Sequence, residues 1–304
     1  MYDVIIIGAG PAGLSAATYA GRAGLNCLIL ESTMYGGQIT STSEVENYPA
    51  LKKTAGWELA ENLYQQAVSF GAKLNFEEVK SIIDDGMLKT VVTPENAYVT
   101  KTVIIANGAK RRHLGVEGED ELSGKGVSYC AFCDGSFFKD KTVCVCGGGN
   151  TALEDALYLS NICKTVYLVH RRNEYRAQKH IIDIVNKTEN IVPVLSYVPV
   201  KISGENTVQS ITLKQVETGE EKLIETDAVF VCIGLSPENN AFAEIVELDK
   251  NGYIVADESC ETTCKGIFAA GDTRTKVLRQ IVTAASDGAV AATAALTYIN
   301  QTEG

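Results

Sequence analysis

The sequence predicts an α/β protein built from two units of the same kind. Residues 4–23 have the pattern of a buried strand, a glycine turn and an alanine-rich helix. The same pattern returns at residues 143–161, and its first glycine lies 139 positions after the first glycine of the earlier turn. A chain of 304 residues is long enough for two separate cores. We therefore expect an internal repeat with one core for each copy.

The first copy carries the pattern of a dinucleotide-binding turn. A strand at residues 4–7 leads into the glycine turn at residues 8–13, and a second strand at residues 27–30 ends on Glu31. Glycine lets the backbone approach a pyrophosphate, the helix N-terminus supplies N–H donors, and the acid accepts from a ribose hydroxyl. The alternative is a glycine-rich turn with a surface glutamate. The predicted Rossmann-like contacts are Gly8, Gly10, Pro11, Ala12, Gly13 and Glu31.

The second copy differs at the position that reads the ribose. A strand at residues 143–146 precedes the turn at residues 147–152, and His170 stands where the first copy has Glu31. The cationic residues Arg171, Arg172 and Arg176 follow it. An acid repels a 2′-phosphate, whereas arginine binds one. The first copy therefore favours FAD or NAD and the second favours NADP(H). The alternative is that these charged residues are an ordinary solvent-exposed segment with no ligand.

The order of the motifs predicts that the second unit is inserted into the first. Strands with a Thr-to-Gly form, at residues 102–108 and 226–234, would close the two units. No third glycine turn follows, so the apolar segment at residues 266–272 should return to the first unit. Polar stretches at 116–126 and 239–249 are the expected crossings. The expected domains are 1–117 with 246–304, and 118–245.

A pair of cysteines, Cys130 and Cys133, stands just before the second glycine turn. Two thiols at this spacing can close a disulfide within one helical turn and can act as nucleophile and leaving group. The alternative is half of a zinc site. Zinc would need two further ligands, and the chain has no second Cys-x-x-Cys and only three histidines. We expect a redox pair, no metal ion, and structural roles for the other seven cysteines, with a pairing of Cys260 and Cys264 as the alternative for those two.

Composition narrows the class of protein further. With 45% apolar and 21% charged residues, the chain has a globular composition rather than a disordered or membrane-embedded one. The formal charge of −11 argues against binding to nucleic acid or to an anionic membrane. The apolar run near Met1 is too short for a signal peptide. We expect a cytoplasmic, thiol-reducing location.

Together these motifs closely resemble the low-molecular-weight thioredoxin reductases, and the resemblance covers essentially the whole chain. Three residues depart from the family pattern: Phe132 replaces Thr inside the redox loop, Asn107 replaces Thr of Ala-Thr-Gly, and Thr273 replaces Val. The shared motifs are residues 8–13, Gly36-Gly37-Gln38, Asn47-Tyr48-Pro49, Cys130–Gly135, Gly147–Ala152, His170-Arg171-Arg172 with Arg176, Phe268–Asp272, and Arg279-Gln280.

The resemblance implies a set of site residues. Those along FAD would be Gly36, Gly37, Gln38 and Asn47, then Asp272 on the ribityl chain, with Arg279, Gln280 and Ile281 beside the flavin. Those along NADPH would be Gly147, Gly149, Asn150 and Thr151, with the 2′-phosphate at His170, Arg171, Arg172 and Arg176. Cys133 would lie nearer the flavin, Cys130 would be its partner, and Asp134 would donate and accept the proton. A homodimer and a thioredoxin substrate are also implied.

Three redox carriers in one chain predict an order of electron transfer. NADPH would reduce FAD, the flavin would reduce the Cys130–Cys133 disulfide, and the dithiol would reduce thioredoxin. The disulfide and the NADPH turn lie on one unit and both must reach one flavin, which favours a swing of that unit over a static relay. Other interpretations are a dithiol oxidase or a ferredoxin-fed reductase, against which the intact His170-Arg171-Arg172 and Arg176 argue, and a redox or nucleotide sensor. A peroxide-reducing relative is disfavoured because its extra N-terminal redox domain is not found in this sequence.

Overall fold

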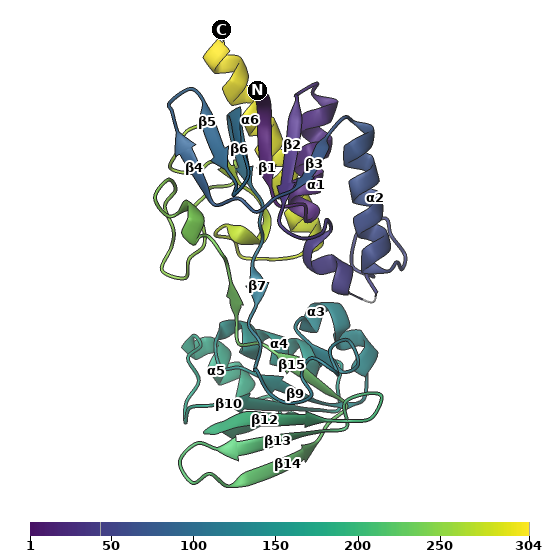
Figure 1. Cartoon of the computed structure of the whole chain (residues 1–304). Coiled ribbons are helices and arrows are strands. Elements are labelled where there is room, and N and C mark those ends of the chain that lie inside the picture. Colours follow the sequence, from purple (N-terminus) through teal and green to yellow (C-terminus); the bar gives the residue numbers. More distant parts are fainter. Residues whose placement is uncertain (43, 304) are drawn as a thin grey trace. The chain divides into compact units, whose positions relative to one another are not determined.

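The computed structural model describes residues 1–42 and 44–303. The chain forms two compact units, one of residues 1–110 and 236–304 and the other of residues 111–235, so the second unit is inserted into the first (Figure 1). Both divisions come earlier in the chain than expected. Isolated apolar residues explain the difference: Leu114 and Val116 pack on the core of the second unit, and Phe242 belongs to the core of the first.

The first unit is a seven-stranded sheet covered by helices. Its strand order is β3-β2-β1-β6-β5-β4, with β17 also paired to β6. The strands β3, β2, β1, β6 and β17 run parallel, and β4 and β5 are antiparallel. The strands are β1 (Tyr2–Ile7), β2 (Cys27–Glu31), β3 (Lys73–Phe76), β4 (Ser81–Asp84), β5 (Lys89–Val92), β6 (Ala97–Ile105) and β17 (Ile267–Ala269). The helices are α1 (Pro11–Arg22), α2 (Gly56–Ser69) and α6 (Ile281–Glu303), with short 3-10 turns η1 (Gly37–Ser41), η3 (Asn240–Phe242) and η4 (Gly271–Thr273).

Close packing of α1 against α6 places the start of α6 beside the first glycine turn. A Cβ atom on Gly288 would lie 2.1 Å from the carbonyl oxygen of Ala12, so only glycine fits there. The Ser15 hydroxyl donates to the carbonyl oxygen of Ala285 at 2.6 Å. Buried alanines on both helices fill the remaining space. None of the helices in the described part of the chain is long and apolar enough to cross a membrane.

The second unit repeats the strand-turn-helix-strand pattern of the first, as the sequence predicts. Its parallel sheet has the order β11-β10-β9-β15-β8, and β12-β13-β14 form a separate antiparallel sheet. The strands are β8 (Val127–Ser128), β9 (Thr142–Cys146), β10 (Thr165–His170), β11 (Ile191–Leu195), β12 (Tyr197–Ser203), β13 (Ser210–Gln215), β14 (Glu221–Glu225) and β15 (Ala228–Val231). The helices are α3 (Ala131–Asp134), α4 (Asn150–Ser160) and α5 (Lys179–Val185), with the 3-10 turn η2 (Gly135–Phe138).

The chain leaves the first unit through β7 (Lys110–Arg111) and returns through β16 (Leu235–Ser236). Within the described part of the chain, these two short strands pair only with each other. The chain therefore crosses between the units twice, through two strands that pair with each other.

Candidate redox and dinucleotide sites

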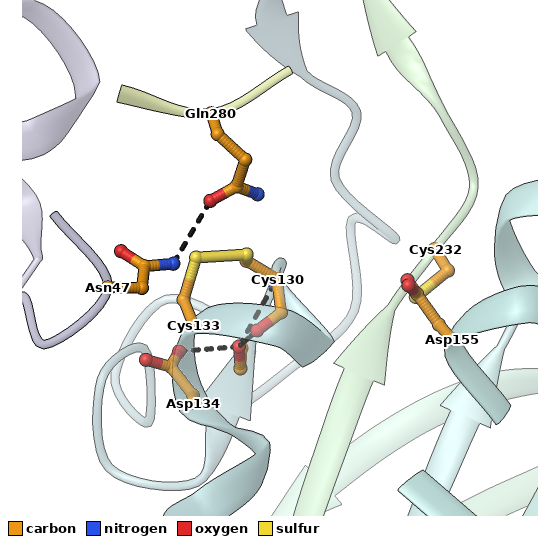
Figure 2. The surroundings of a disulfide bond; sticks show 8 residues. Asn47, Cys130, Cys133, Asp134, Asp155, Cys232 and Gln280 are labelled. Carbon is orange, nitrogen blue, oxygen red and sulfur yellow. Dashed lines mark hydrogen bonds between the residues drawn. A yellow bond between two sulfur atoms is a disulfide. The ribbon is translucent and has the colours of Figure 1, made fainter. Parts of the chain in front are cut away.

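Cys130 and Cys133 form a disulfide, with their Cα atoms 5.3 Å apart (Figure 2). Cys130 precedes the short helix α3, and its carbonyl oxygen accepts from the N–H groups of Cys133 and Asp134 at 3.2 and 3.1 Å. Both cysteines are half-buried. The other seven cysteines are free thiols. The pairing is the one that the redox interpretation requires, and the described residues contain no cluster of potential metal ligands.

Asp134 lies beside the disulfide in an environment that favours its protonated form. Burial raises the pKa of Asp134, and the Ser128 hydrogen bond and the Arg111 charge oppose this only in part. The Ser128 hydroxyl donates to Asp134 Oδ2 at 2.6 Å and accepts from the Cys130 N–H at 3.1 Å. Ser128 therefore links the carboxyl to the cysteine backbone. No sequence pattern points to Ser128, because a lone serine at the end of a strand has no characteristic signature.

The first glycine turn has the shape that a pyrophosphate needs. A Cβ atom on Gly8 would lie 2.5 Å from the Ala106 oxygen, and one on Gly13 would lie 1.9 Å from the Gly8 oxygen. Both glycines are required by packing, whereas a Cβ atom on Gly10 would meet nothing within 4 Å. Glu31 ends β2, and its Oε2 accepts from the Ala9 N–H at 2.9 Å. The open face at Gly10 and the acid at the end of β2 fit a dinucleotide.

Three of the other predicted flavin-side residues are held by hydrogen bonds within the first unit. The N–H of Gly36, which has φ +98°, donates to the carbonyl oxygen of Ala9 at 2.7 Å. Gln38 donates through Nε2 to the carbonyl oxygen of Ala109. Asn47 Nδ2 donates to Gln280 Oε1 at 3.1 Å (Figure 2).

Asp272 lies in η4, directly after β17. A Cβ atom on its neighbour Gly271, which has φ +79°, would lie 2.8 Å from Ala12 Cβ, so this turn abuts the start of α1. The Arg279 guanidinium lies over the Tyr253 ring at 4.1 Å, and α6 begins at Ile281. The first glycine turn, Glu31 and Asp272 thus lie at the carboxyl ends of strands β1, β2 and β17 of one sheet.

A buried ionic cluster beneath η4 was not predicted from the sequence. Asp287 accepts from the Gly271 N–H at 2.9 Å, from Arg274 Nε and Nη2 at 2.8 and 2.9 Å, and from Lys276 Nζ at 2.8 Å. Burial alone would raise the pKa of Asp287, but its hydrogen bonds to Arg274 and Lys276 hold it below the ordinary value. These residues share no motif, and a charged residue on an amphipathic helix is normally expected at the surface.

The second glycine turn is built in the same way. A Cβ atom on Gly147 would lie 2.3 Å from the Cys232 oxygen, whereas one on Gly149 would meet nothing within 4 Å. The N–H of Arg176 donates to the carbonyl oxygen of Gly148 at 2.7 Å, and Asn150 Oδ1 accepts from the Gln178 N–H at 2.8 Å. The segment after β10 therefore folds back onto the turn. Thr151, in the first turn of α4, is exposed.

His170 has surroundings unlike those expected of a phosphate ligand. It is buried, and a Cβ atom on Gly148 would lie only 2.1 Å from its ring. Burial lowers the pKa of His170, as do the nearby charges of Arg171, Arg172 and Arg176, so the ring is neutral at pH 7. Its Nε2 has no hydrogen-bond partner among the described residues. The three arginines are exposed, so they present the positive charge at this turn.

Two open glycine turns and a disulfide next to a carboxyl of raised pKa define a dinucleotide-dependent disulfide oxidoreductase. Residues 2–288 match the model of the pyridine nucleotide-disulphide oxidoreductase family. Thioredoxin reductase of Treponema pallidum is 46% identical over 98% of this chain and 97% of its own, and that of Bacillus subtilis is 43% identical over 99% and 96%. This chain belongs to the pyridine nucleotide-disulphide oxidoreductase family, in its thioredoxin reductase branch, and uses a flavin and a nicotinamide cofactor.

Solved structures agree with this assignment. Thioredoxin reductase from Streptococcus pyogenes has a TM-score of 0.95 at 40% identity, with 99% of each chain covered. The enzyme from Lactococcus lactis, described in its FR conformation, has a TM-score of 0.68 at 39% identity, with 99% of this chain and 100% of that chain covered. The resemblance inferred from the sequence and the fold class are confirmed.

Proposed function

We propose that this protein is an NADPH-dependent thioredoxin-disulfide reductase that uses FAD. Electrons would pass from NADPH to FAD, from FAD to the Cys130–Cys133 disulfide, and from the resulting dithiol to thioredoxin. One observation carries the proposal: the disulfide and the arginine-flanked glycine turn lie in one unit, and the acid-flanked glycine turn lies in the other. The protein would be a cytoplasmic homodimer, like the family that it resembles.

The first unit would bind FAD. Gly8, Gly10, Pro11, Ala12 and Gly13 would cradle the pyrophosphate, because the turn is open at Gly10 and exposes the N-terminus of α1. Glu31, fixed by the Ala9 N–H, would accept from the adenosine ribose. The remaining contacts would come from Gly36, Gly37, Gln38, Asn47, Asp272, Arg279, Gln280 and Ile281.

The second unit would bind NADPH through Gly147, Gly149, Asn150 and Thr151. The exposed guanidinium groups of Arg171, Arg172 and Arg176 would bind the 2′-phosphate, since arginine forms charge-assisted hydrogen bonds with phosphate oxygens. Buried His170 would support the turn by packing under Gly148 rather than by its charge.

The cysteine pair would transfer two electrons to thioredoxin by thiol-disulfide exchange. FAD, when bound, accepts a hydride from NADPH and supplies two electrons to the disulfide. One thiolate of the reduced pair would attack the thioredoxin disulfide and release one thioredoxin thiolate. The second would then attack the mixed disulfide, closing Cys130–Cys133 again and releasing the other. Asp134, whose pKa burial raises, would hold a proton beside this exchange and return it to a leaving thiolate.

Cysteine variants test the electron route. We expect Cys130→Ser and Cys133→Ser each to abolish thioredoxin reduction, because a single thiol cannot complete the exchange. Both should retain FAD and its reduction by NADPH, because the disulfide lies downstream of the flavin. Rapid-mixing absorbance of the flavin band measures that reduction, and steady-state turnover with thioredoxin measures the whole route.

The matched control is Cys163→Ala, which removes a free thiol of the same unit and should leave turnover unchanged. Near-normal turnover in either Cys130→Ser or Cys133→Ser would contradict the route. Wild-type protein that is colourless and takes up no FAD would contradict the proposed cofactor.

A further inference from the structure

Two of the residues that depart from the family pattern share one buried partner in the first unit. Asn107 follows β6, Thr273 ends η4, and Asn239 precedes η3. Asn107 Nδ2 donates to Asn239 Oδ1 at 3.1 Å, and the Thr273 hydroxyl donates to the same oxygen at 2.8 Å. Asn239 and Thr273 are buried. The network thus connects the end of β6 to the turn that carries Asp272.

The hydrogen bonds fix the orientation of both amides. Asn239 Nδ2 donates to the carbonyl oxygens of Gly252 and Thr273 at 2.9 and 3.1 Å, and carbonyls only accept. Oδ1 is therefore the atom of Asn239 that faces Asn107. Asn107 must present its amino group to that oxygen, and the same amino group donates to the carbonyl oxygen of Glu238 at 3.2 Å. Rotating either amide by 180° would bring two acceptors together.

This arrangement leaves one hydrogen-bond acceptor of the network without a donor among the described residues. Asn107 Oδ1 is buried and accepts no hydrogen bond from the described residues. Buried side-chain acceptors are rarely left unsatisfied in folded proteins, and those that are usually have a functional reason. Since the network holds the amide in place, Oδ1 is a preorganised acceptor for a donor that the chain itself does not provide.

Asn107 lies next to the first glycine turn, on the side away from Glu31. A Cβ atom on Gly8 would lie 2.9 Å from Asn107 Cα. The strand order β2-β1-β6 puts Glu31, at the end of β2, on one side of the turn and Asn107, after β6, on the other. A dinucleotide with its pyrophosphate at the turn and its adenosine ribose at Glu31 has its flavin half on the β6 side.

We propose that Asn107 is a flavin-binding residue whose Oδ1 accepts a hydrogen bond from the flavin N3–H or from a ribityl hydroxyl. These are the donors of the oxidised flavin half, whereas ionised phosphates only accept. The inference rests on the proposed binding of FAD in the first unit. Asn239 is a positioning residue that holds the amide for this contact, and Thr273 shares its oxygen.

A double-mutant cycle on FAD affinity tests the contact. Deflavinated wild type and Asn107→Leu are titrated with FAD, 3-methyl-FAD and the 2′-, 3′- and 4′-deoxyribityl analogues, with the change in flavin fluorescence as the readout. In wild type, we expect the analogue that lacks the donor to bind up to about tenfold more weakly than FAD. In Asn107→Leu, that analogue and FAD should bind equally well, because the acceptor is already gone.

The controls separate this contact from a structural effect. Thr273→Val removes a bond of the network but keeps Asn107 Oδ1, so the wild-type discrimination should persist. Asn107→Ala replaces Asn107→Leu if leucine prevents folding, as judged by thermal melting. The inference would be overturned if each analogue lost as much affinity relative to FAD in Asn107→Leu as in wild type. That result would leave the proposed function intact. Wild type that binds no FAD would overturn both.

Discussion

At the second glycine turn, the positive charge lies on the arginines and not on the histidine. His170 is neutral and packed under Gly148, whereas Arg171, Arg172 and Arg176 are exposed. The sequence predicts that all four residues bind the 2′-phosphate, because histidine, like arginine, can carry a positive charge. Burial in the folded unit distinguishes them, and that depends on packing that no local pattern encodes.

The arginines should therefore determine cofactor preference. Each charge-assisted hydrogen bond lost is worth about 1.5–3 kcal/mol, or roughly 10- to 150-fold in NADPH KM. We expect Arg171→Gln with Arg172→Gln to raise the KM for NADPH by at least this factor and to leave the KM for NADH nearly unchanged. Lys187→Gln, an exposed cation of the same unit, is the control. Equal losses for both cofactors would show that these arginines do not read the 2′-phosphate.

A second residue-scale feature is the buried pair of Asp155 and Cys232. The Cys232 thiol donates to Asp155 Oδ2 at 3.0 Å, and Figure 2 shows the two side chains next to each other. Burial raises the pKa of Asp155 to about 6, and the Cys232 hydrogen bond lowers it only in part. The folded state therefore holds this proton more tightly than the unfolded state, in which the pKa is about 4. Its contribution to stability is complete below pH 4 and is lost as pH rises to about 6.

Asp155→Asn should remove this pH dependence. The pKa difference corresponds to about 3 kcal/mol between low pH and pH 7. We expect the unfolding free energy of the variant, measured with urea and compared with wild type, to rise relative to wild type by up to that amount between pH 4 and pH 7. Asp183→Asn, an exposed acid of the same unit, is the control. A difference between Asp155→Asn and wild type that is constant with pH would contradict the assignment.

At the scale of elements, α6 supports the turn η4 through a buried carboxylate. Asp287 joins the Gly271 N–H to Arg274 and Lys276, and all of these side chains are buried. Two cations around one anion are stable only while the anion is present, because each would otherwise be buried without a partner. The cluster therefore ties the Asp272 turn to the helix that packs on α1.

Asp287→Ala should be strongly destabilising. Breaking a buried ion pair by removing one partner costs about 3–5 kcal/mol. We expect a loss of this size in the unfolding free energy of the deflavinated protein, measured with urea at pH 7, and weaker FAD binding. Glu244→Ala, an exposed acid of the same unit, should change neither quantity. A loss for Asp287→Ala as small as that of the control would contradict the role of the cluster.

The sequence predicts the elements whose pattern is local. The apolar runs at 4–7 and 27–30 lie in β1 and β2, the chain turns at the glycines between strand and helix in both units, and Cys130 forms a disulfide with Cys133. The repeat is visible because both copies need the same small residues at the same offsets. These features depend on residues within a few positions of each other, so a single sequence is sufficient to predict them.

Contacts between distant residues could not be predicted in this way. Asn239 forms hydrogen bonds with Asn107, 132 positions away in the sequence, and with Thr273, 34 positions away. Cys232 forms one with Asp155, 77 positions away. A polar residue gives the same local pattern whether its partner is water or a buried amide. The exact crossings were also missed, because Leu114 and Phe242 are single apolar residues in polar stretches, too few to form a period.

At the scale of the whole molecule, the proposed reaction requires that the nicotinamide and the disulfide each approach the same flavin. Cys133 and Gly147, the start of the NADPH turn, are only 14 residues apart and lie in the same unit. The other unit would hold FAD, and the chain crosses between the two units at β7 and β16. We propose that the second unit turns about these crossings between the half-reactions. A static relay, with disulfide and nicotinamide on opposite faces of the flavin, is the alternative.

Rapid-mixing absorbance of the flavin band in tethered enzyme tests this claim most directly. Engineered cysteine pairs, one residue in each unit, would trap the units in either of two orientations. With the disulfide held at the flavin, hydride transfer from NADPH should slow sharply, while chemically reduced flavin still reduces Cys130–Cys133. With the nicotinamide held there, flavin reduction should be fast and then stop before the disulfide. Reduction of the tether should restore both steps, and unimpaired transfer through both steps in both tethered forms would contradict the swing.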